Sequence, residues 1–313
     1  MKEFIINKND SGQRVDKFVT KALPELPKSM MYKLFRKKDI KINGKKCDIS
    51  AVLSEGDIVR IYVKDEVSAV RTADTGFLSA SDDLKIAYED KNILVAFKPV
   101  GVDSHANGET HSDTLIDRIK KYLYDKGEYN PESENSFSPA LCSRLDRNTA
   151  GLIISAKNAE SLREINSAIK DGKIHKIYQC ITVSKPPKNS DILTAYHKID
   201  DKRNIVRISD KYADGYKEIK TGYKILGEKN GLFLLEITLY TGRKHQIRAH
   251  LSHIGAPILG DGKYGNIALN KRYGVFYQEL CACRLSFGLD ENSPLAYLNK
   301  TEIKVPAFEK KFN

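Results

Sequence analysis

From about residue 84 onward, the sequence contains short apolar runs that have the length of β-strands, with few helical patterns between them. The clearest runs are residues 86–88, 93–97, 152–156, 177–183 and 232–239. Runs of this kind between polar turn residues are typical of strands in a packed sheet. Strands that mostly follow one another without crossover helices pair mainly antiparallel. The pattern therefore predicts an α+β domain with a large mixed, mainly antiparallel sheet rather than a doubly wound parallel sheet.

Two segments of this strand-rich part have helical patterns. The first follows Asn158, a favourable N-cap, and ends at Gly172. The second extends from about His245 to Gly255, where a glycine again provides the stop signal. The polar segment 125–138 is rich in Ser and Asn, so we expect an exposed loop there.

The first 64 residues have a different pattern and are dense in basic groups. Apolar residues at helical spacing over 15–22 predict one short helix, and Ser29 is expected to cap a second helix whose outward face is basic. After that helix, Asn43-Gly44 is a strong hairpin signal, and the alternation over 58–63 predicts a strand. Together these features predict a compact unit of two helices followed by a strand pair.

We therefore divide the chain into two domains, because 313 residues exceed what a single hydrophobic core usually serves. Residues 1–65 form a small N-terminal α+β domain, and residues 83–313 form the large domain. Residues 66–82 are small, polar and without periodicity, so we interpret them as a linker.

The net charge favours partners that are polyanions, because 52 Lys and Arg residues against 41 Asp and Glu residues leave a formal charge of +11. Composition leaves a second interpretation open, since many soluble proteins are basic without binding nucleic acid. No apolar run approaches the length of a membrane span, and the N-terminus lacks the features of a secretion signal. We therefore expect a cytoplasmic protein.

The cysteines and histidines do not have the spacing of a metal site. Cys281 and Cys283 are separated by one residue in an apolar stretch that suits a strand. His245 and His250 are five positions apart and so lack the i, i+4 spacing that places two ligands on one helical face. The sequence predicts that the protein binds no metal.

The N-terminal domain resembles a known RNA-binding module. Its stretch from Gln13 to Val63, with RVDKFV, a basic second helix, the KINGK turn and EGDIVRIYV, is similar to the S-four-type module of ribosomal and RNA-modifying proteins. The resemblance implies that the basic helix and the hairpin contact RNA phosphates. The implied contacts are Lys33, Arg36, Lys37, Lys41 and Lys45. The alternative is a solvated helix face, which is the usual role of such charges.

Four separated stretches of the large domain are unlike ordinary surface or core. They are residues 98–102 (KPVGV), 143–151 (SRLDRNTAG), 176–178 (KIY) and 241–250 (TGRKHQIRAH). In this order they resemble the motifs of the RluA-type pseudouridine synthases, which isomerise uridine in RNA. With the N-terminal module included, the resemblance covers nearly the whole chain.

Asp146 is the residue that this resemblance implies to be catalytic. Uridine isomerisation breaks a carbon–nitrogen glycosidic bond, rotates the uracil and rejoins it through another ring carbon, and a carboxylate can serve at the sugar or at the ring. The sequence does not decide among attack on the ribose, addition to the ring and assistance in removing a sugar proton. Taken alone, an Asp before Arg-Asn-Thr is more often a turn cap.

Two arginines and a tyrosine complete the implied site. A carboxylate that stays ionised in a closed pocket needs a nearby cation, and the resemblance assigns this role to Arg248, with a phosphate clamp as the alternative. Arg243 fits RNA contact or structural pairing better. The resemblance supports Tyr178 as a ring that stacks on the target base, whereas the alternative is a core residue. We interpret His245 and His250 as neutral hydrogen-bonding residues.

The target base must leave its stack before it can react, and the resemblance implies that Arg144 enters the space that the base leaves. Two positions depart from the family pattern, since Ser143 stands where the family has His and Ala150 stands where it has Ser. Neither departure predicts an inactive enzyme. Beyond the first motif, His105 and Asn107 are further residues that could contact RNA.

The sequence thus predicts an RNA pseudouridine synthase that acts as a monomer and needs no cofactor. The resemblance implies large-subunit ribosomal RNA as the first expected substrate and transfer RNA as the second. A non-catalytic RNA-binding or ribosome-assembly factor on the same fold is the alternative, favoured only by Ser143. A base-releasing RNA glycosidase is a third hypothesis, but it would need a second acidic residue close to Asp146, and the motif contains none.

Overall fold

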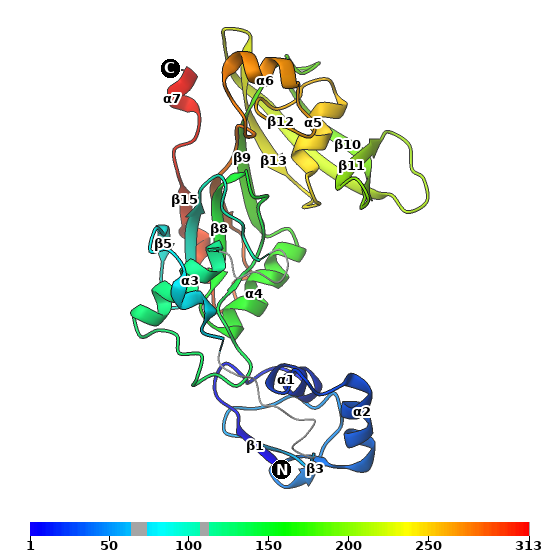
Figure 1. The fold of residues 1–313 in the computed structure, drawn as a ribbon, viewed down its shortest axis with the longest axis vertical. Coiled ribbons are helices and arrows are strands. Elements are labelled where there is room, and N and C mark those ends of the chain that lie inside the picture. The colour runs from blue at the N-terminus through cyan, green and yellow to red at the C-terminus, as the bar shows by residue number, and fades with distance from the viewer. Residues whose placement is uncertain (64–73, 107–112, 313) are drawn as a thin grey trace.

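The computed structural model describes residues 1–63, 74–106 and 113–312. The molecule is elongated, with a small N-terminal unit at one end and a large strand-rich unit forming the rest (Figure 1). The two units have separate sheets, with four strands in the small one and eleven in the large one. The hydrophobic core of the N-terminal unit contains only residues of that unit.

The N-terminal unit folds as two helices against an antiparallel sheet. In chain order its elements are β1 (Lys2–Ile5), α1 (Val15–Ala22), α2 (Lys28–Lys37), β2 (Ile40–Ile42), β3 (Lys45–Lys46) and β4 (Ile58–Ile61). The strand order is β1-β4-β2-β3. The hairpin prediction is confirmed, because Asn43 and Gly44 join β2 to β3 with φ of 51° and 76°, as a tight hairpin turn requires.

Two details of this unit differ from the sequence predictions. The sheet contains β1, which the pattern did not indicate because only Phe4 of its four residues is buried. Helix α2 begins at Lys28, and its N-cap is Pro27 rather than Ser29. Proline fixes its own φ, so the chain can enter the helix directly after it without a side-chain cap.

The large unit contains one bent, mixed sheet. Its strands are β5 (Lys85–Glu89), β6 (Ile93–Lys98), β7 (Ala140–Leu141), β8 (Ala150–Ala156), β9 (Ile174–Thr182), β10 (Ser190–Asp200), β11 (Ile205–Ser209), β12 (Lys217–Lys229), β13 (Leu232–Leu239), β14 (Leu280–Phe287) and β15 (Glu302–Lys304). The main order is β11-β10-β12-β13-β9-β14-β8-β6-β5. Strands β8 and β14 pair in parallel, and the other neighbours within the described sheet are antiparallel. The predicted α+β class with a mainly antiparallel sheet is confirmed.

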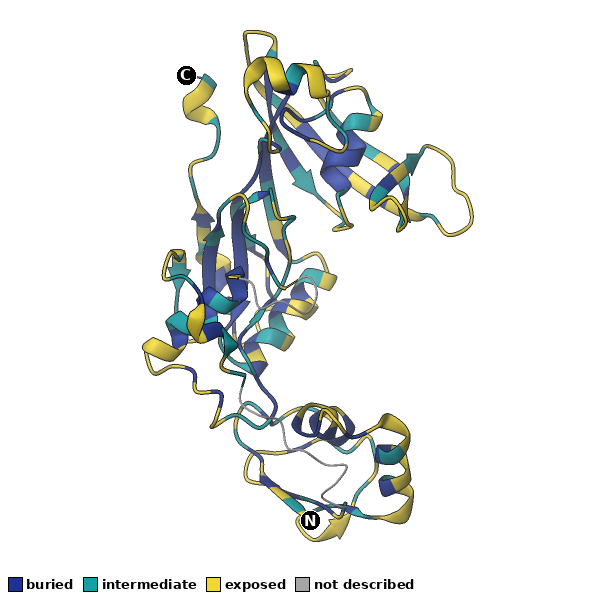
Figure 2. Ribbon diagram, viewed as in Figure 1, coloured by how far each residue is buried: buried dark blue, intermediate teal, exposed yellow. Residues whose placement is uncertain are grey.

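Helices cover both faces of the strands β6 and β8. The helical elements of the large unit are η2 (Gly76–Ser79), α3 (Leu115–Asp125), α4 (Ala159–Lys170), α5 (Gln246–His253), α6 (Ile267–Tyr273), η3 (Ala296–Lys300) and α7 (Glu309–Phe312). Leu94 packs in the cluster that contains α3, whereas its neighbours Ile93 and Val95 pack in the cluster that contains α4. Burial on both faces explains the continuous apolar run of β6 and the buried centre of the sheet (Figure 2).

The helix predictions are partly confirmed. Helix α4 begins after Asn158, whose side chain accepts a hydrogen bond from the Ser161 amide at 2.8 Å. Helix α5 corresponds to the predicted segment after His245. Helices α3 and α6 are absent from the sequence predictions.

Part of the predicted linker packs on the large unit. Residues 66–73 lie outside the described part of the chain. Of the remainder, η2 carries Phe77, which is 1% exposed and packs in the cluster that contains α3. A buried aromatic ring contributes to the core, so this end of the segment is not a free linker.

The prediction of an exposed loop at 125–138 is wrong for part of this segment. Tyr129, Ser136 and Phe137 are all buried. Tyr129 packs with Phe77 in the cluster that contains α3, and the N-terminal unit contacts residues 134–136. Contacts between segments so far apart in the sequence leave no local pattern. Composition alone therefore suggested an exposed loop where the fold provides an interface.

Gly151 lies at a close backbone contact in the sheet. It lies in β8 opposite Ala282 of β14, where the two strands pair in parallel. Its φ is +127°, and a Cβ atom there would lie 2.4 Å from the backbone nitrogen and oxygen of Ala282. Real Cβ atoms do not approach backbone this closely, so only glycine allows the pairing.

We expect Gly151→Ala to lower the free energy of unfolding by about 3 kcal/mol or more, because backbone strain and a forced separation of β8 from β14 add together. Urea unfolding measures the loss. Gly127→Ala is the matched control. Gly127 also has positive φ (+71°), but within the described chain only its sequence neighbours lie within 4 Å of the place that a new methyl group would take. We therefore expect a loss of about 1 kcal/mol there. Equal losses in the two variants would contradict the close-contact explanation.

Candidate active site

Asp146 lies in the turn between β7 and β8. The Thr149 amide donates to the Asp146 carbonyl oxygen at 3.0 Å, which closes the turn. The carboxylate is 29% exposed and is therefore accessible from solvent. Its hydrogen-bond partner is Arg248 of α5. Because this partner is 102 positions away in the sequence, the turn-cap alternative does not describe the side chain.

The loop of the first motif holds this turn in place. Lys98 is fully buried, and its Nζ donates to the carbonyl oxygens of Pro99, Val102 and Arg147 at 3.0, 2.7 and 2.8 Å. The Gly101 amide also donates to the Arg147 carbonyl at 3.0 Å. Burial lowers the pKa of Lys98 to about 8. The amine still carries its proton at neutral pH, so it can tie the 98–102 loop to the residue that follows Asp146.

Arg248 joins Asp146 to a second carboxylate. Its Nη1 donates to Asp146 Oδ2 at 2.7 Å, while its Nε and Nη2 donate to the two oxygens of Asp261 at 2.7 and 2.9 Å. Burial would lower the pKa of Arg248, but the hydrogen bonds and charges of Asp261 and Asp146 raise it above its ordinary value. The guanidinium is thus a fixed cation whose free edge points at Asp146.

Asp261 is a site residue that the sequence motifs did not reveal. It is fully buried, and it also accepts hydrogen bonds from the backbone amides of Lys263 and Tyr264 at 2.8 and 3.0 Å. Burial would raise the pKa of Asp261, but its hydrogen bonds with Arg248 and the charge of Arg248 lower it. The available signal was an Asp between two glycines shortly after the 241–250 motif, which by itself indicates only a turn.

Tyr178 lies in β9 and packs with Leu145, which precedes Asp146, in the cluster that includes Ile247 of α5. Its side chain is buried, yet its hydroxyl forms no hydrogen bond with any residue that the structure describes. Burial raises the pKa of Tyr178 well above its usual value, and the charge of Asp146 adds to this effect. The phenol is therefore protonated at neutral pH and can donate a hydrogen bond.

The two histidines of the last motif are hydrogen-bonded and neutral. His245 Nδ1 lies 2.8 Å from the Tyr264 hydroxyl, and its Nε2 lies 3.9 Å from Asp146 Oδ2. His250 Nδ1 lies 3.1 Å from the Thr221 hydroxyl. Burial lowers the pKa of each histidine to about 4. This agrees with their interpretation as neutral residues that hold the loop and the helix.

The two arginines predicted to contact RNA are exposed. Arg144 lies two residues before Asp146, and Arg243 lies just before α5. Neither forms an ion pair within the described parts of the chain. Close to Arg144, the buried Nδ1 of His105 also has no hydrogen-bond partner among the residues that the structure describes. Asn107 lies outside the described residues.

The basic residues of the N-terminal unit lie far from this site, since α2 and β3 are at the opposite end of the molecule from α5 (Figure 1). Lys33, Arg36, Lys37 and Lys45 are exposed. Lys41 differs from them, because its Nζ lies over the ring of Tyr62 at 5.1 Å from the centroid. The structure does not bring these residues to Asp146, so they would act on a different part of a ligand.

Within the described ranges, no group of three or more His, Cys, Asp or Glu side chains is arranged to hold a metal ion. None of the helices that the structure describes has the length and apolar character needed to cross a membrane.

Comparison with known proteins identifies the family. Residues 92–253 match the model of a family described as RNA pseudouridylate synthase, and these residues include Asp146, Tyr178 and Arg248. A protein of Mycoplasma capricolum subsp. capricolum called an uncharacterized RNA pseudouridine synthase is 35% identical over 98% of each chain. This chain belongs to the RNA pseudouridine synthase family. Its motifs are of the RluA type, and enzymes of the family are isomerases.

Other relatives support the same assignment. A ribosomal large subunit pseudouridine synthase C of Rickettsia felis is 31% identical and covers 90% of this chain and 92% of its own. Among solved structures, human RNA pseudouridylate synthase domain containing 4 is 22% identical, with a TM-score of 0.55 over 71% of this chain and 88% of its own. The structural match shows that the large unit of this synthase has the fold of that domain.

The bridging role of Arg248 leads to a prediction for Asp261. We expect Asp261→Asn to lower kcat about a hundredfold, because the amide cannot accept both guanidinium hydrogen bonds and the free edge of Arg248 shifts relative to Asp146. The KM for RNA should change much less. Single-turnover kinetics on a target RNA measure both effects. Asp210→Asn, which alters an exposed pair with His253, is the matched control and should keep its activity; similar losses in both variants would argue against the bridge.

Burial of His250 predicts a dependence of stability on pH. The pKa of His250 is about 4 when folded and 6.5 for an unburied side chain, so between these values the unfolded chain binds a proton that the folded protein lacks. Stability therefore falls as the pH decreases from about 6.5 to about 4, by up to about 1.4 kcal/mol per pH unit from this residue. In His250→Asn this part of the slope should disappear, as urea unfolding across the pH range would show. An unchanged slope would refute the assignment.

Proposed function

We propose that this enzyme converts specific uridines of large-subunit ribosomal RNA to pseudouridine, with Asp146 as the catalytic carboxylate. The observation that carries the proposal is the 2.7 Å contact between Asp146 and a buried arginine at an accessible turn. Several relatives, including those of Rickettsia felis and Rickettsia conorii, carry the name ribosomal large subunit pseudouridine synthase C. Their names support this substrate over transfer RNA, which is the second candidate.

The arrangement suits a reaction that detaches and reattaches a base. Arg248 pairs with the charged form of Asp146 and leaves one carboxylate oxygen free to act at the ribose or at the uracil ring. The reaction needs no oxidant or added group, because the same uracil returns through a carbon–carbon bond. The ring carbon that joins the sugar releases its proton to solvent, and the ring nitrogen that left the sugar takes up a proton. We propose the Asp146 carboxylate as the reacting group. Chemical trapping of the intermediate would show whether it acts at the ribose or at the uracil ring.

Tyr178 is proposed to hold the detached uracil. Its side chain lies in the cluster that includes Leu145, and its hydroxyl has no partner among the described residues. Because its pKa is raised by burial, the phenol acts as a hydrogen-bond donor or a stacking ring rather than as a base. A ring held by packing on a strand limits how far a free base can move.

The exposed arginines are proposed to handle the rest of the RNA. Arg144 is close enough to Asp146 in the sequence to fill the space that the flipped nucleotide leaves. Arg243 is exposed just before α5, and we propose that it contacts a phosphate there. In the N-terminal unit, which we propose to be an S-four-type RNA-binding domain of residues 1–65, Lys33, Arg36 and Lys37 offer charges on the outer face of α2. Lys41 and Lys45 extend this basic surface over the hairpin.

We further propose that the enzyme acts as a monomer in the cytoplasm, because the site described above is built from a single chain. The net charge of +11 supports attraction to RNA, and this attraction weakens as salt increases. Mapping pseudouridines in ribosomal and transfer RNA of cells that lack the protein would identify the substrate. A complete set of pseudouridines in such cells would leave only a non-catalytic RNA-binding role.

We expect Asp146→Asn to abolish pseudouridine formation while RNA affinity stays within about threefold, because the carboxylate acts in chemistry and contributes little to phosphate binding. Release of tritium from 5-tritiated uridine measures the first quantity, and filter binding measures the second. Asp171→Asn, at an exposed carboxylate after α4, is the control and should behave like wild type. Retained activity in Asp146→Asn would overturn the assignment.

A further inference from the structure

The loop of residues 129–138 in the large unit, called the docking loop below, forms hydrogen bonds with the N-terminal unit. Asn9 Nδ2 donates to Glu134 Oε1 at 2.6 Å. Asn135 Nδ2 donates to the carbonyl oxygen of Ile5, at the end of β1, at 2.9 Å. These contacts join residues about 125 to 130 positions apart in the sequence. They therefore report how the two units are arranged rather than how either one folds.

Asp10 is at the centre of this contact. Its carboxylate accepts from Ser136 Oγ at 2.5 Å and from Asn135 Nδ2 at 2.7 Å. Gln13 Nε2 also donates to Ser136 Oγ, at 2.8 Å. Asp10 is fully buried although it is a charged residue of the smaller unit. Within its own unit the carboxylate accepts from the Asn7 amide at 3.4 Å, and its two shorter hydrogen bonds come from the docking loop.

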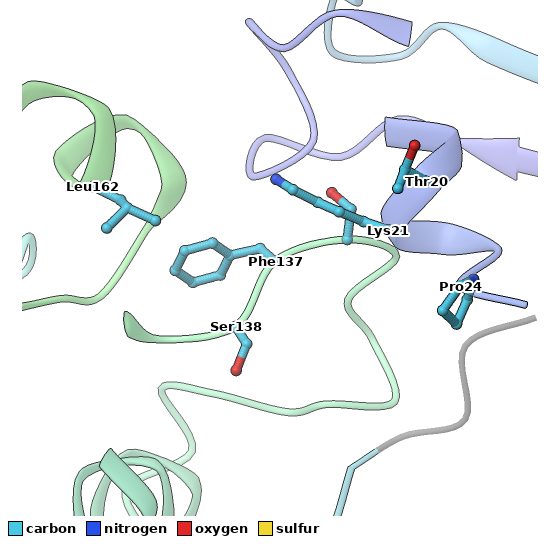
Figure 3. A pocket seen from close by; sticks show the side chains of 7 residues that line it. Thr20, Lys21, Pro24, Phe137, Ser138 and Leu162 are labelled. Carbon is cyan, nitrogen blue, oxygen red and sulfur yellow. The ribbon is translucent and has the colours of Figure 1, made fainter. Parts of the chain in front are cut away.

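The two units meet through polar groups rather than through a shared apolar core. The core cluster of the N-terminal unit contains only its own residues. Beside the hydrogen bonds, α1 and the docking loop leave a cavity of about 390 Å³. Figure 3 shows Phe137 of the docking loop pointing toward Leu162 of α4, with Lys21 and Thr20 of α1 on the other side of the cavity. The polar contacts around Asp10 therefore contribute to the orientation of the two units.

A buried carboxylate is a strong orienting group. If the units met in another register, Asp10 would be covered without Ser136 and Asn135 and would keep only the Asn7 amide, 3.4 Å away, as a donor. Burying a charge that has lost most of its donors is costly. If the units separated, water would replace the lost hydrogen bonds. The contact therefore discriminates between orientations of the two units more than it stabilises their association.

We propose that Asp10 and the docking loop hold the N-terminal unit in one orientation, so that the enzyme selects RNAs in which the target uridine and a second structured element have a fixed spacing. This inference rests on the proposed function in one respect, namely that RNA is the substrate. Asp10 is a positioning residue here, since it is far in the sequence from Asp146 and belongs to the opposite unit.

The fixed orientation matters because α2, with its exposed basic residues, lies far from α5, which carries Arg248 of the active site (Figure 1). An RNA that reaches both regions gains from both contacts without a further cost of ordering the protein. An RNA with a different spacing gains from only one. A unit held by a flexible tether would distinguish such RNAs far less well.

The test uses Asn135→Asp in the full chain. The substitution keeps the shape of the side chain but places an oxygen near Asp10 Oδ2, where an amide donor lay at 2.7 Å. We expect small-angle X-ray scattering to show a larger radius of gyration and a more flexible particle, with an unchanged thermal midpoint for the large unit. Asn130→Asp makes the same chemical change in the docking loop at an exposed residue whose side chain accepts from the nearby Glu132 amide, and it should scatter like wild type.

A second substitution should reverse the first. In Asp10→Asn/Asn135→Asp the donor and the acceptor exchange places, and we expect the compact particle to return for the most part. Asp10→Ala alone removes the acceptors of both Asn135 and Ser136 and should expand the particle as Asn135→Asp does. An unchanged radius of gyration in both single variants would overturn the proposal.

The specificity is measured with two RNAs that carry the same target uridine, a long fragment that includes neighbouring helices and a minimal stem-loop. We expect Asn135→Asp to lower kcat/KM on the long fragment by about tenfold or more and to leave the stem-loop within about twofold. Equal effects on the two RNAs would overturn the selection by spacing. If the wild-type enzyme forms no pseudouridine on either RNA, the proposed function is wrong. The scattering of the variants still tests independently whether the docking loop holds the N-terminal unit in one orientation.

Discussion

The proposed active site depends on one arginine that binds two carboxylates. Arg248 is held by Asp261 through two hydrogen bonds and offers its remaining edge to Asp146. Three segments meet there: the turn between β7 and β8, the start of α5 and the loop at residue 261. A buried cation is tolerated because both partners are charged, and each partner would be costly to bury without it. The charge of each of the three groups is therefore stabilised by the others.

The sheet holds Asp146 and its charged partners with little freedom to move. The parallel pairing of β8 with β14 requires the close backbone approach at Gly151, only a few residues after Asp146. Lys98 holds the other side of the turn by binding three carbonyl oxygens. A reactive carboxylate placed on a turn would usually be mobile, but here rigid strands and a buried amine limit its motion. This rigidity suits a reaction in which a base must detach and rejoin at the same sugar.

In the proposed function, the large and N-terminal units contribute to separate parts of RNA recognition. The large unit supplies the chemistry, and family membership accounts for its fold and activity. The N-terminal unit supplies exposed positive charge at a distance, and charge alone gives affinity without position. The polar contact around Asp10 provides the position. The docking loop donates to the buried charge of Asp10 through neutral polar side chains. Because such side chains are also common in exposed loops, its composition resembles that of an exposed loop.

The sequence by itself determined the α+β class, several strands, the hairpin at Asn43 and the motifs that contain Asp146 and Arg248. These features are readable because apolar periodicity, turn chemistry and motif spacing are local. Only the tertiary structure decided the partnership of Arg248 with Asp261, the edge strand β1 and the burial of the docking loop. Each of these depends on segments that the chain brings together from a distance. Polar partners of that kind leave no periodic trace, because a carboxylate has the same local pattern whether it faces water or a buried guanidinium.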